Sequence, residues 1–205
     1  MTPATPPATP ARTAVEAALI LASGSPYRAE MLARLGLPFS SADSGVDETP
    51  EDGESPDALV RRLAVTKASQ VARKNPGALV VGADQVAVHD DRVLGKPGNR
   101  ERAIEQLEGM SGGRVEFLSG IALVGDDFER VDAVPTVLVF RPLARAEIER
   151  YVDRDRPFDC AGAMRSESLG IALLESLTSD DPSALIGLPL IRLSEWLREA
   201  GLGIP

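Results

Sequence analysis

The chain has 205 residues, of which 43% are hydrophobic and 26% charged, a length and composition typical of one soluble globular domain. Its formal net charge of −9, without any cluster of Lys or Arg, argues against binding to a nucleic-acid backbone. No apolar run approaches the about 20 residues of a membrane span, no signal-peptide pattern occurs, and the single cysteine excludes an internal disulfide, so we expect a cytoplasmic protein.

The chain opens with a segment unlike the rest. Residues 1–13 (MTPATPPATPART) are rich in Pro, Ala and Thr and contain no periodic apolar residues, which predicts a disordered tail. The folded domain is therefore expected to span residues 14–205.

The first part of this domain predicts strands and helices in turn. Residues 18–22 (ALILA) form a short apolar run typical of a strand buried on both faces. A helix should follow, with Ser25 as N-cap, Pro26 in the first position and Gly36 as terminator. A second helix is expected from residue 55 to about residue 74, where apolar residues recur at helical spacing.

The remaining elements predict an antiparallel extension. The apolar run 79–83 indicates a second buried strand, which should end at Asp84. The later predicted elements are a hairpin of 86–88 with 93–94, a helix over 99–109, two long strands over 115–124 and 128–140, a helix over 144–153 and a final helix over about 189–200. This order predicts an α/β fold: a single domain built on a mixed, twisted sheet with flanking helices.

One turn between a strand and a helix has the composition of an anion site. The Ser-Gly-Ser-Pro sequence from Ser23 places backbone N–H groups and hydroxyls at a helix start, which favours binding of an anion. Arg28, in the first helical turn, could add a bidentate contact to a phosphate. An ordinary helix cap beside a solvated arginine would explain the same residues.

Acids and lysines lie in four further segments. Asp84 suits a metal ligand, a general base or a turn cap, whereas Glu48, in a polar loop, could be plain surface charge. Lys67 falls on the apolar stripe of the second helix, where a lysine needs a partner, and Lys96 lies in a Gly-Lys-Pro turn. Cations for a polyphosphate, with acids for a divalent metal and a base, indicate a phosphate-anhydride hydrolase.

The segments from about Leu19 to Leu197 resemble the Maf family of nucleoside triphosphate pyrophosphatases. The matching pieces are LILASGSPYR, GVDET, LAVTKA, GADQV, LGKP, SGIAL, CAGAMRSESLGI and LIGLPL. The resemblance implies a Maf/ITPase-like fold in which Asp84 is the proton acceptor. It also implies a divalent cation, Mg²⁺ or Mn²⁺, at Glu48 and Asp84. The phosphate-binding residues that it implies are Ser23, Ser25, Arg28, Lys67 and Lys96.

Three positions resemble the branch of the family associated with 7-methyl-GTP: Tyr27, Gln85 and Glu167. An aromatic face attracts the positively charged 7-methylguanine ring, and a carboxylate can accept hydrogen bonds from guanine. Without the resemblance, Tyr27 would be taken as a core residue and Glu167 as a solvated acid. Arg165 and Ser168 stand where relatives carry Lys and Gly.

The expected function is hydrolysis of 7-methyl-GTP to 7-methyl-GMP and pyrophosphate, which removes a modified nucleotide from the pool. Two alternatives stay open: a dTTP/UTP pyrophosphatase of the same family, and a non-catalytic nucleotide-binding regulator of cell division. The expected partner is a small-molecule nucleotide, without nucleic acid or membrane, and a homodimer is left open.

Overall fold

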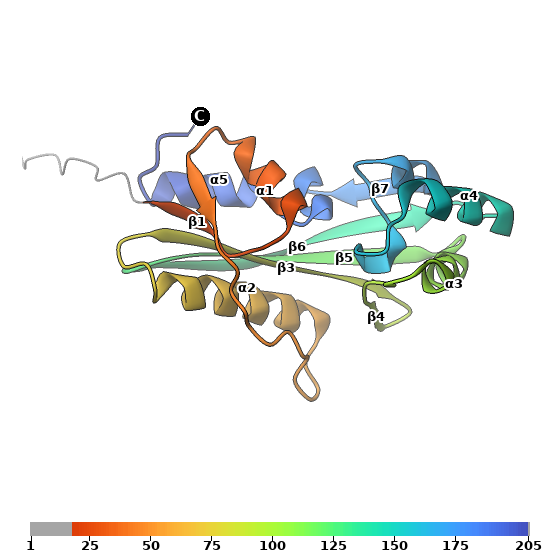
Figure 1. Cartoon of the computed structure of the whole chain (residues 1–205), viewed down its shortest axis with the longest axis horizontal. Helices are drawn as coiled ribbons and strands as arrows, with labels where there is room; N and C mark the ends of the chain where they lie inside the picture. The colour runs from red at the N-terminus through yellow and green to blue at the C-terminus, as the bar shows by residue number, and fades with distance from the viewer. Residues whose placement is uncertain (1–17, 205) are drawn as a thin grey trace, which may run out of the picture.

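The computed structural model describes residues 18–204, so the predicted tail lies outside the described residues. A mixed seven-stranded sheet forms its centre (Figure 1). The strands are β1 (Leu19–Leu21), β2 (Phe39–Ser41), β3 (Leu79–His89), β4 (Arg92–Leu94), β5 (Arg114–Gly125), β6 (Phe128–Phe140) and β7 (Leu174–Ser179). Their order is β2-β1-β3-β5-β6-β7, with β4 paired to β3. β1 runs parallel to β2 and β3, and the other pairs are antiparallel.

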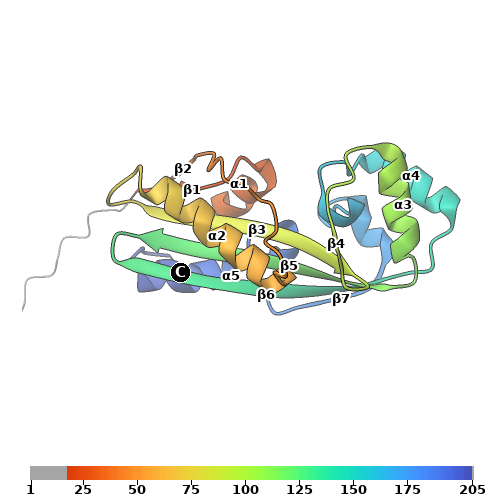
Figure 2. The same ribbon diagram turned by 90° about the horizontal axis from the view of Figure 1, so that it is seen from below.

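Helices cover both faces of this sheet. The α-helices are α1 (Pro26–Ala33), α2 (Pro56–Ala72), α3 (Arg100–Met110), α4 (Arg145–Asp155) and α5 (Leu190–Glu199). Three short 3₁₀ turns complete the list: η1 (Ala161–Ala163), η2 (Leu169–Leu173) and η3 (Pro182–Ile186). α2 lies against one face, α1 and α5 lie against the other, and α3 and α4 pack together at the far end of the long strands (Figures 1 and 2). Within residues 18–204, no helix is both long and apolar enough to cross a membrane.

The alternation of side chains along the strands assigns each core. Leu21 and Val81 face α1 and α5, where they pack with Trp196, while Ile20 and Val80 face α2. Because successive side chains of a strand point to opposite faces, Asp84 is directed toward α2 and its neighbour in sequence toward the opposite face. The carboxylate of Asp84 and the amide of Gln85 therefore lie on opposite faces of the sheet.

The predicted α/β fold with a mixed sheet and flanking helices is confirmed, and so are the two predicted helix starts. Ser25 and Ser55 cap α1 and α2 through side-chain oxygens, each followed by proline. The predicted hairpin turn is also present, with Asp90 and Asp91 both at positive φ, as a two-residue type I′ turn requires.

The prediction that a strand ends at Asp84 is wrong. β3 continues without a break from residue 79 to residue 89, and Asp84 lies in its middle, paired with Gly120 of β5. Asp84 and Gln85 resemble a strand end because buried strands are expected to be uniformly apolar. Asp84 has a hydrogen-bond partner on one face of the sheet and Gln85 has partners on the other, so a buried strand can contain both polar side chains.

Candidate active site

The turn from β1 into α1 forms the first wall of the site. The backbone N–H of Ser25 donates to Ser23 Oγ (3.1 Å), and Ser25 Oγ accepts from the N–H of Arg28 (3.4 Å). The turn therefore satisfies part of its own hydrogen-bonding capacity. Both hydroxyls act as acceptors in these bonds, and their own protons stay available to donate to an anion.

Arg28 reaches from α1 across the site. Its Nε donates to the carbonyl oxygen of Gly187 (3.0 Å), and its Nη1 donates to Ser23 Oγ (3.4 Å). Burial lowers the pKa of the guanidinium, and the negative charges of Asp84 and Glu48 oppose that shift. An arginine held in this way is a fixed positive charge beside the turn.

Two carboxylates converge on one lysine. Lys67, from α2, is only 5% exposed, and its Nζ lies 2.6 Å from Asp84 Oδ1 and 2.5 Å from Glu48 Oε1. Asp84 is itself 7% exposed, whereas Glu48 comes from an exposed loop. This pairing supplies the partner that a lysine on the apolar stripe of a helix needs.

Two adjoining cavities open beside this cluster. The larger has a volume of about 330 Å³ and the smaller about 130 Å³. Residues that line the larger one include Ser23, Ser25, Arg28, Glu48, Lys67 and Lys96. Residues that line the smaller one include Tyr27, Gln85, Phe117, Cys160 and Glu167. Ser25, Arg28, Lys96 and Asp159 line both. Asp84 lines neither cavity, but it is paired with Lys67, which lines the larger one.

The smaller cavity has one polar wall and one aromatic wall. Gln85 Nε2 donates to Ser119 Oγ (2.9 Å) and to the carbonyl oxygens of Ala184 (3.0 Å) and Leu185 (2.9 Å). The amide nitrogen is thereby committed, and the Oε1 atom is left as an acceptor. The other wall includes Tyr27, and the Arg165 guanidinium lies over its ring, 5.4 Å from the centroid.

Sequence reasoning did not single out several residues of this site. Asp159 lines both cavities, and its only signal was its position next to the matching segment that begins at Cys160. Ser119 fixes Gln85, and a hydroxyl inside a buried strand was the signal for it. Cys160 is half-buried at the cavity wall and not a core residue, and burial raises the pKa of its thiol to about 12.

The donors present fit a hard divalent cation. Among residues 18–204, no group of three or more His, Cys, Asp or Glu side chains could hold a metal by itself. Glu48 and Asp84 nevertheless bring two carboxylate oxygens to one positive charge. Mg²⁺ is commonly bound by one or two carboxylates together with substrate phosphates and water. This pair therefore suits a cation that arrives with a polyphosphate.

Comparison with known proteins places most of the chain in one family. The model of the family described as Maf-like protein matches residues 18–200. A protein of Nitrosococcus oceani named 7-methyl-GTP pyrophosphatase is 52% identical over 185 residues, covering 89% of this chain and 93% of its own. A Pseudomonas aeruginosa protein with the same name is 50% identical over 189 residues, which cover 91% of this chain and 98% of that protein.

A solved structure, titled "The structure of the Staphylococcus aureus Ham1 protein", overlaps 60% of this chain and 72% of its own. Its TM-score is 0.43 at 16% sequence identity, a likeness too weak to bear on function.

Proposed function

Because the chain belongs to the Maf family, we propose that it hydrolyses 7-methyl-GTP to 7-methyl-GMP and pyrophosphate, in accordance with the name of its relatives. It would thus be a hydrolase of phosphorus-containing acid anhydrides. The observation that carries the proposal is the convergence of Glu48 and Asp84 on Lys67 beside a cavity lined by anion-binding groups.

The larger cavity is proposed to hold the triphosphate. The hydroxyls of Ser23 and Ser25 donate to phosphate oxygens, and Arg28 and Lys96 offset their negative charge. A divalent cation at Glu48 and Asp84 would supply charge neutralisation and lower the pKa of bound water. Stabilisation of charge on the phosphoryl oxygens is the main demand of phosphoryl transfer, and these residue types meet it.

Asp84 is proposed as the general base. Its carboxylate takes a proton from the attacking water, whose oxygen forms a new bond to the α-phosphorus. The bond from that phosphorus to the bridging oxygen breaks, and pyrophosphate leaves with the bond electrons. Since Asp84 does not line the cavity and its carboxylate is paired with Lys67, the ammonium of Lys67 must move toward the phosphates before Asp84 can take a proton from the water.

The smaller cavity is proposed to select the base through Tyr27, Gln85 and Glu167. Gln85 offers its Oε1 atom, because its amide nitrogen is committed to Ser119 and to two backbone carbonyls. This acceptor, with the Glu167 carboxylate, matches the N1–H and amino donors of guanine. The ring of Tyr27 matches the positive charge of the methylated base.

A dTTP/UTP pyrophosphatase is the second candidate, favoured by one observation. The Arg165 guanidinium covers a face of Tyr27 and places a positive charge where a cationic base would stack. A neutral base would not be repelled there.

The test compares 7-methyl-GTP, GTP, UTP and dTTP with Mg²⁺ or Mn²⁺, and measures pyrophosphate separately from orthophosphate. We expect 7-methyl-GTP to be cleaved fastest, and Asp84→Asn to lower kcat at least about a hundredfold. Lys67→Met should also abolish turnover, whereas Lys74→Met, at an exposed position just after the same helix, should not.

Faster cleavage of UTP or dTTP would reject the assignment of the base and favour the second candidate. Absence of pyrophosphate from all four nucleotides would reject the enzyme and favour a nucleotide-binding regulator of cell division.

We also propose a cytoplasmic location and a role in clearing modified nucleotides. Cell fractionation tests the location, and accumulation of 7-methyl-GTP in a deletion strain tests the role. Sedimentation velocity distinguishes a monomer from the homodimer left open by the sequence.

A further inference from the structure

Glu48 needs something that positions it. Residues 42–51 contain no helix or strand, and the Glu48 side chain is 62% exposed. In the described part of the chain, no backbone–backbone hydrogen bond ties residues 43–50 to the sheet or to a helix. The contact of Glu48 with Lys67 alone would leave the loop that carries it poorly fixed.

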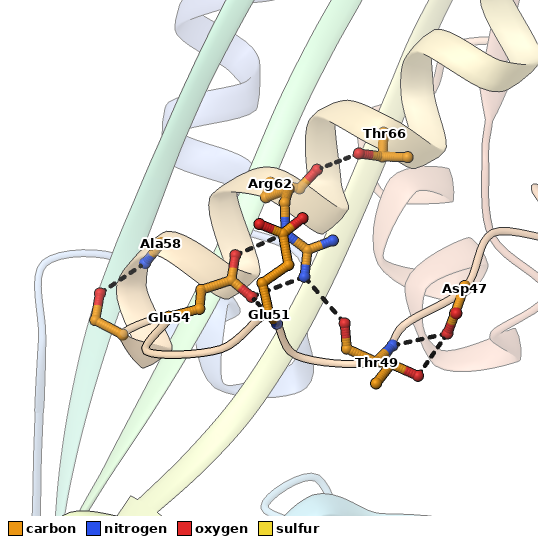
Figure 3. A network of polar contacts seen from close by, with 8 residues as sticks. Asp47, Thr49, Glu51, Glu54, Ala58, Arg62 and Thr66 are labelled. Atoms are coloured by element: carbon orange, nitrogen blue, oxygen red, sulfur yellow. Dashed lines mark hydrogen bonds and ion pairs between the residues drawn. The ribbon is translucent and has the colours of Figure 1, made fainter.

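Arg62, on α2, ties this loop to the body of the protein (Figure 3). Its Nε and Nη2 donate to the two carboxylate oxygens of Glu54, at 2.6 and 2.7 Å. Its Nη2 also donates to the carbonyl oxygen of Thr49 (3.2 Å), and Glu51 Oε1 lies 3.4 Å from its Nε. A bidentate arginine–carboxylate pair is geometrically specific, so the guanidinium plane is fixed by Glu54.

Contacts within the loop pass this restraint to Glu48. Asp47 Oδ1 accepts from both the N–H (2.9 Å) and the Oγ1 hydroxyl (2.6 Å) of Thr49 (Figure 3). Glu48 lies between these two residues in the sequence. Thr49 is the residue whose carbonyl Arg62 holds. The hydrogen bond to Arg62 lowers the pKa of Glu54 to about 2, so the pair stays ionised at neutral pH.

We propose that Arg62 is a positioning residue of the active site, which holds the 47–54 loop on α2 so that Glu48 faces Lys67 and Asp84. The proposal rests on the proposed function, in which Glu48 contacts the divalent cation. Arg62 itself lines neither cavity, so its effect has to pass through the loop.

The experiment compares Arg62→Met with Arg61→Met. Arg61 is the preceding residue of the same helix and pairs instead with Asp57 and Asp132, so its variant removes the same charge from another network. In Arg62→Met we expect faster amide hydrogen exchange across residues 46–51 in the metal-free protein. We also expect an about tenfold higher Mn²⁺ concentration for half-maximal activity, as for other residues that orient metal ligands. Arg61→Met should change neither.

A double-mutant cycle then tests the route. If Arg62 acts through Glu48, Arg62→Met should have no further effect on Mn²⁺ activation in a Glu48→Gln background. Equal effects of Arg62→Met with and without Glu48, or unchanged hydrogen exchange, would overturn the proposal. If Arg62→Met does not fold, Glu54→Gln removes the other half of the pair and should give the same two changes. Wild-type activity of Glu48→Gln would instead reject the role of Glu48 in the proposed function.

Discussion

At the scale of single residues, Arg165 contacts two of the side chains that line the smaller cavity. The Arg165 guanidinium lies over the Tyr27 ring, and its Nε is 3.8 Å from Glu167 Oε1. An aromatic face and a carboxylate are also the partners that we assign to 7-methylguanine, which carries a positive charge. Arg165 and the methylated base therefore compete for the same two groups and repel each other, whereas neutral guanine is not repelled.

We predict that Arg165→Met lowers the KM for 7-methyl-GTP by about threefold to tenfold, a change that corresponds to the free energy of one cation–π contact. The KM for GTP should change less, so the preference for the methylated base rises. Arg156→Met is the matched control, because that guanidinium lies over the ring of Phe158 (5.8 Å), a residue that lines neither of the two cavities. Steady-state kinetics with both nucleotides decide; a higher KM for 7-methyl-GTP would mean that Arg165 binds the substrate.

At the scale of elements, the distance between α2 and the sheet sets the geometry of the site. A Cβ atom at Gly82 would lie 2.1 Å from the carbonyl oxygen of Ala64, and one at Gly120 would lie 2.2 Å from that of Val60. The two glycines therefore let the helix lie directly on β3 and β5. Lys67, one turn beyond Ala64, reaches Asp84 because of this close approach.

We predict that Gly82→Ala costs about 1–3 kcal/mol of the free energy of unfolding, since the helix must move away from the strand. It should also lower kcat, because the same movement separates Lys67 from Asp84. Gly109→Ala, in α3, is the control: nothing lies within 4 Å of its Cβ, and a helical alanine should stabilise the protein by up to about 1 kcal/mol. Urea unfolding and kcat measure both variants; an unchanged Gly82→Ala protein would contradict the packing argument.

Elements with strong local signals could be predicted from the sequence. Ser-Pro starts with helical apolar spacing were sufficient for α1 and α2, and long apolar runs were sufficient for β5 and β6. β7 (LESLTS) was not predicted, because its strand conformation depends on pairing with β6 and not on its own composition. β2 was not predicted for the same reason: it is a three-residue strand with two serines, and it pairs with β1.

At the scale of the whole molecule, the site joins parts of the chain that are far apart in sequence. The predicted residues from Ser23 to Lys96 and Glu167 line the two adjoining cavities, apart from Asp84, which is paired with the lining residue Lys67. Their chemical roles stay predictions. Motifs could indicate these residues because each motif is local. The contacts of Arg62 and of Arg165 could not be predicted, since both depend on how distant loops pack against α2 and α1.

The fold and the catalytic cation should be separable at this scale. Lys67 already pairs with both Glu48 and Asp84, and the cores on both faces of the sheet are built from apolar side chains. We therefore predict that EDTA abolishes turnover but leaves the Tm of the nucleotide-free protein unchanged, and that added Mn²⁺ restores activity without refolding. In Lys67→Met the two carboxylates lose their shared partner, so Mn²⁺ should raise the Tm of this variant more than that of the wild type. Calorimetry with and without EDTA measures both, and a wild-type Tm that falls with EDTA would show a cation on which the fold itself depends.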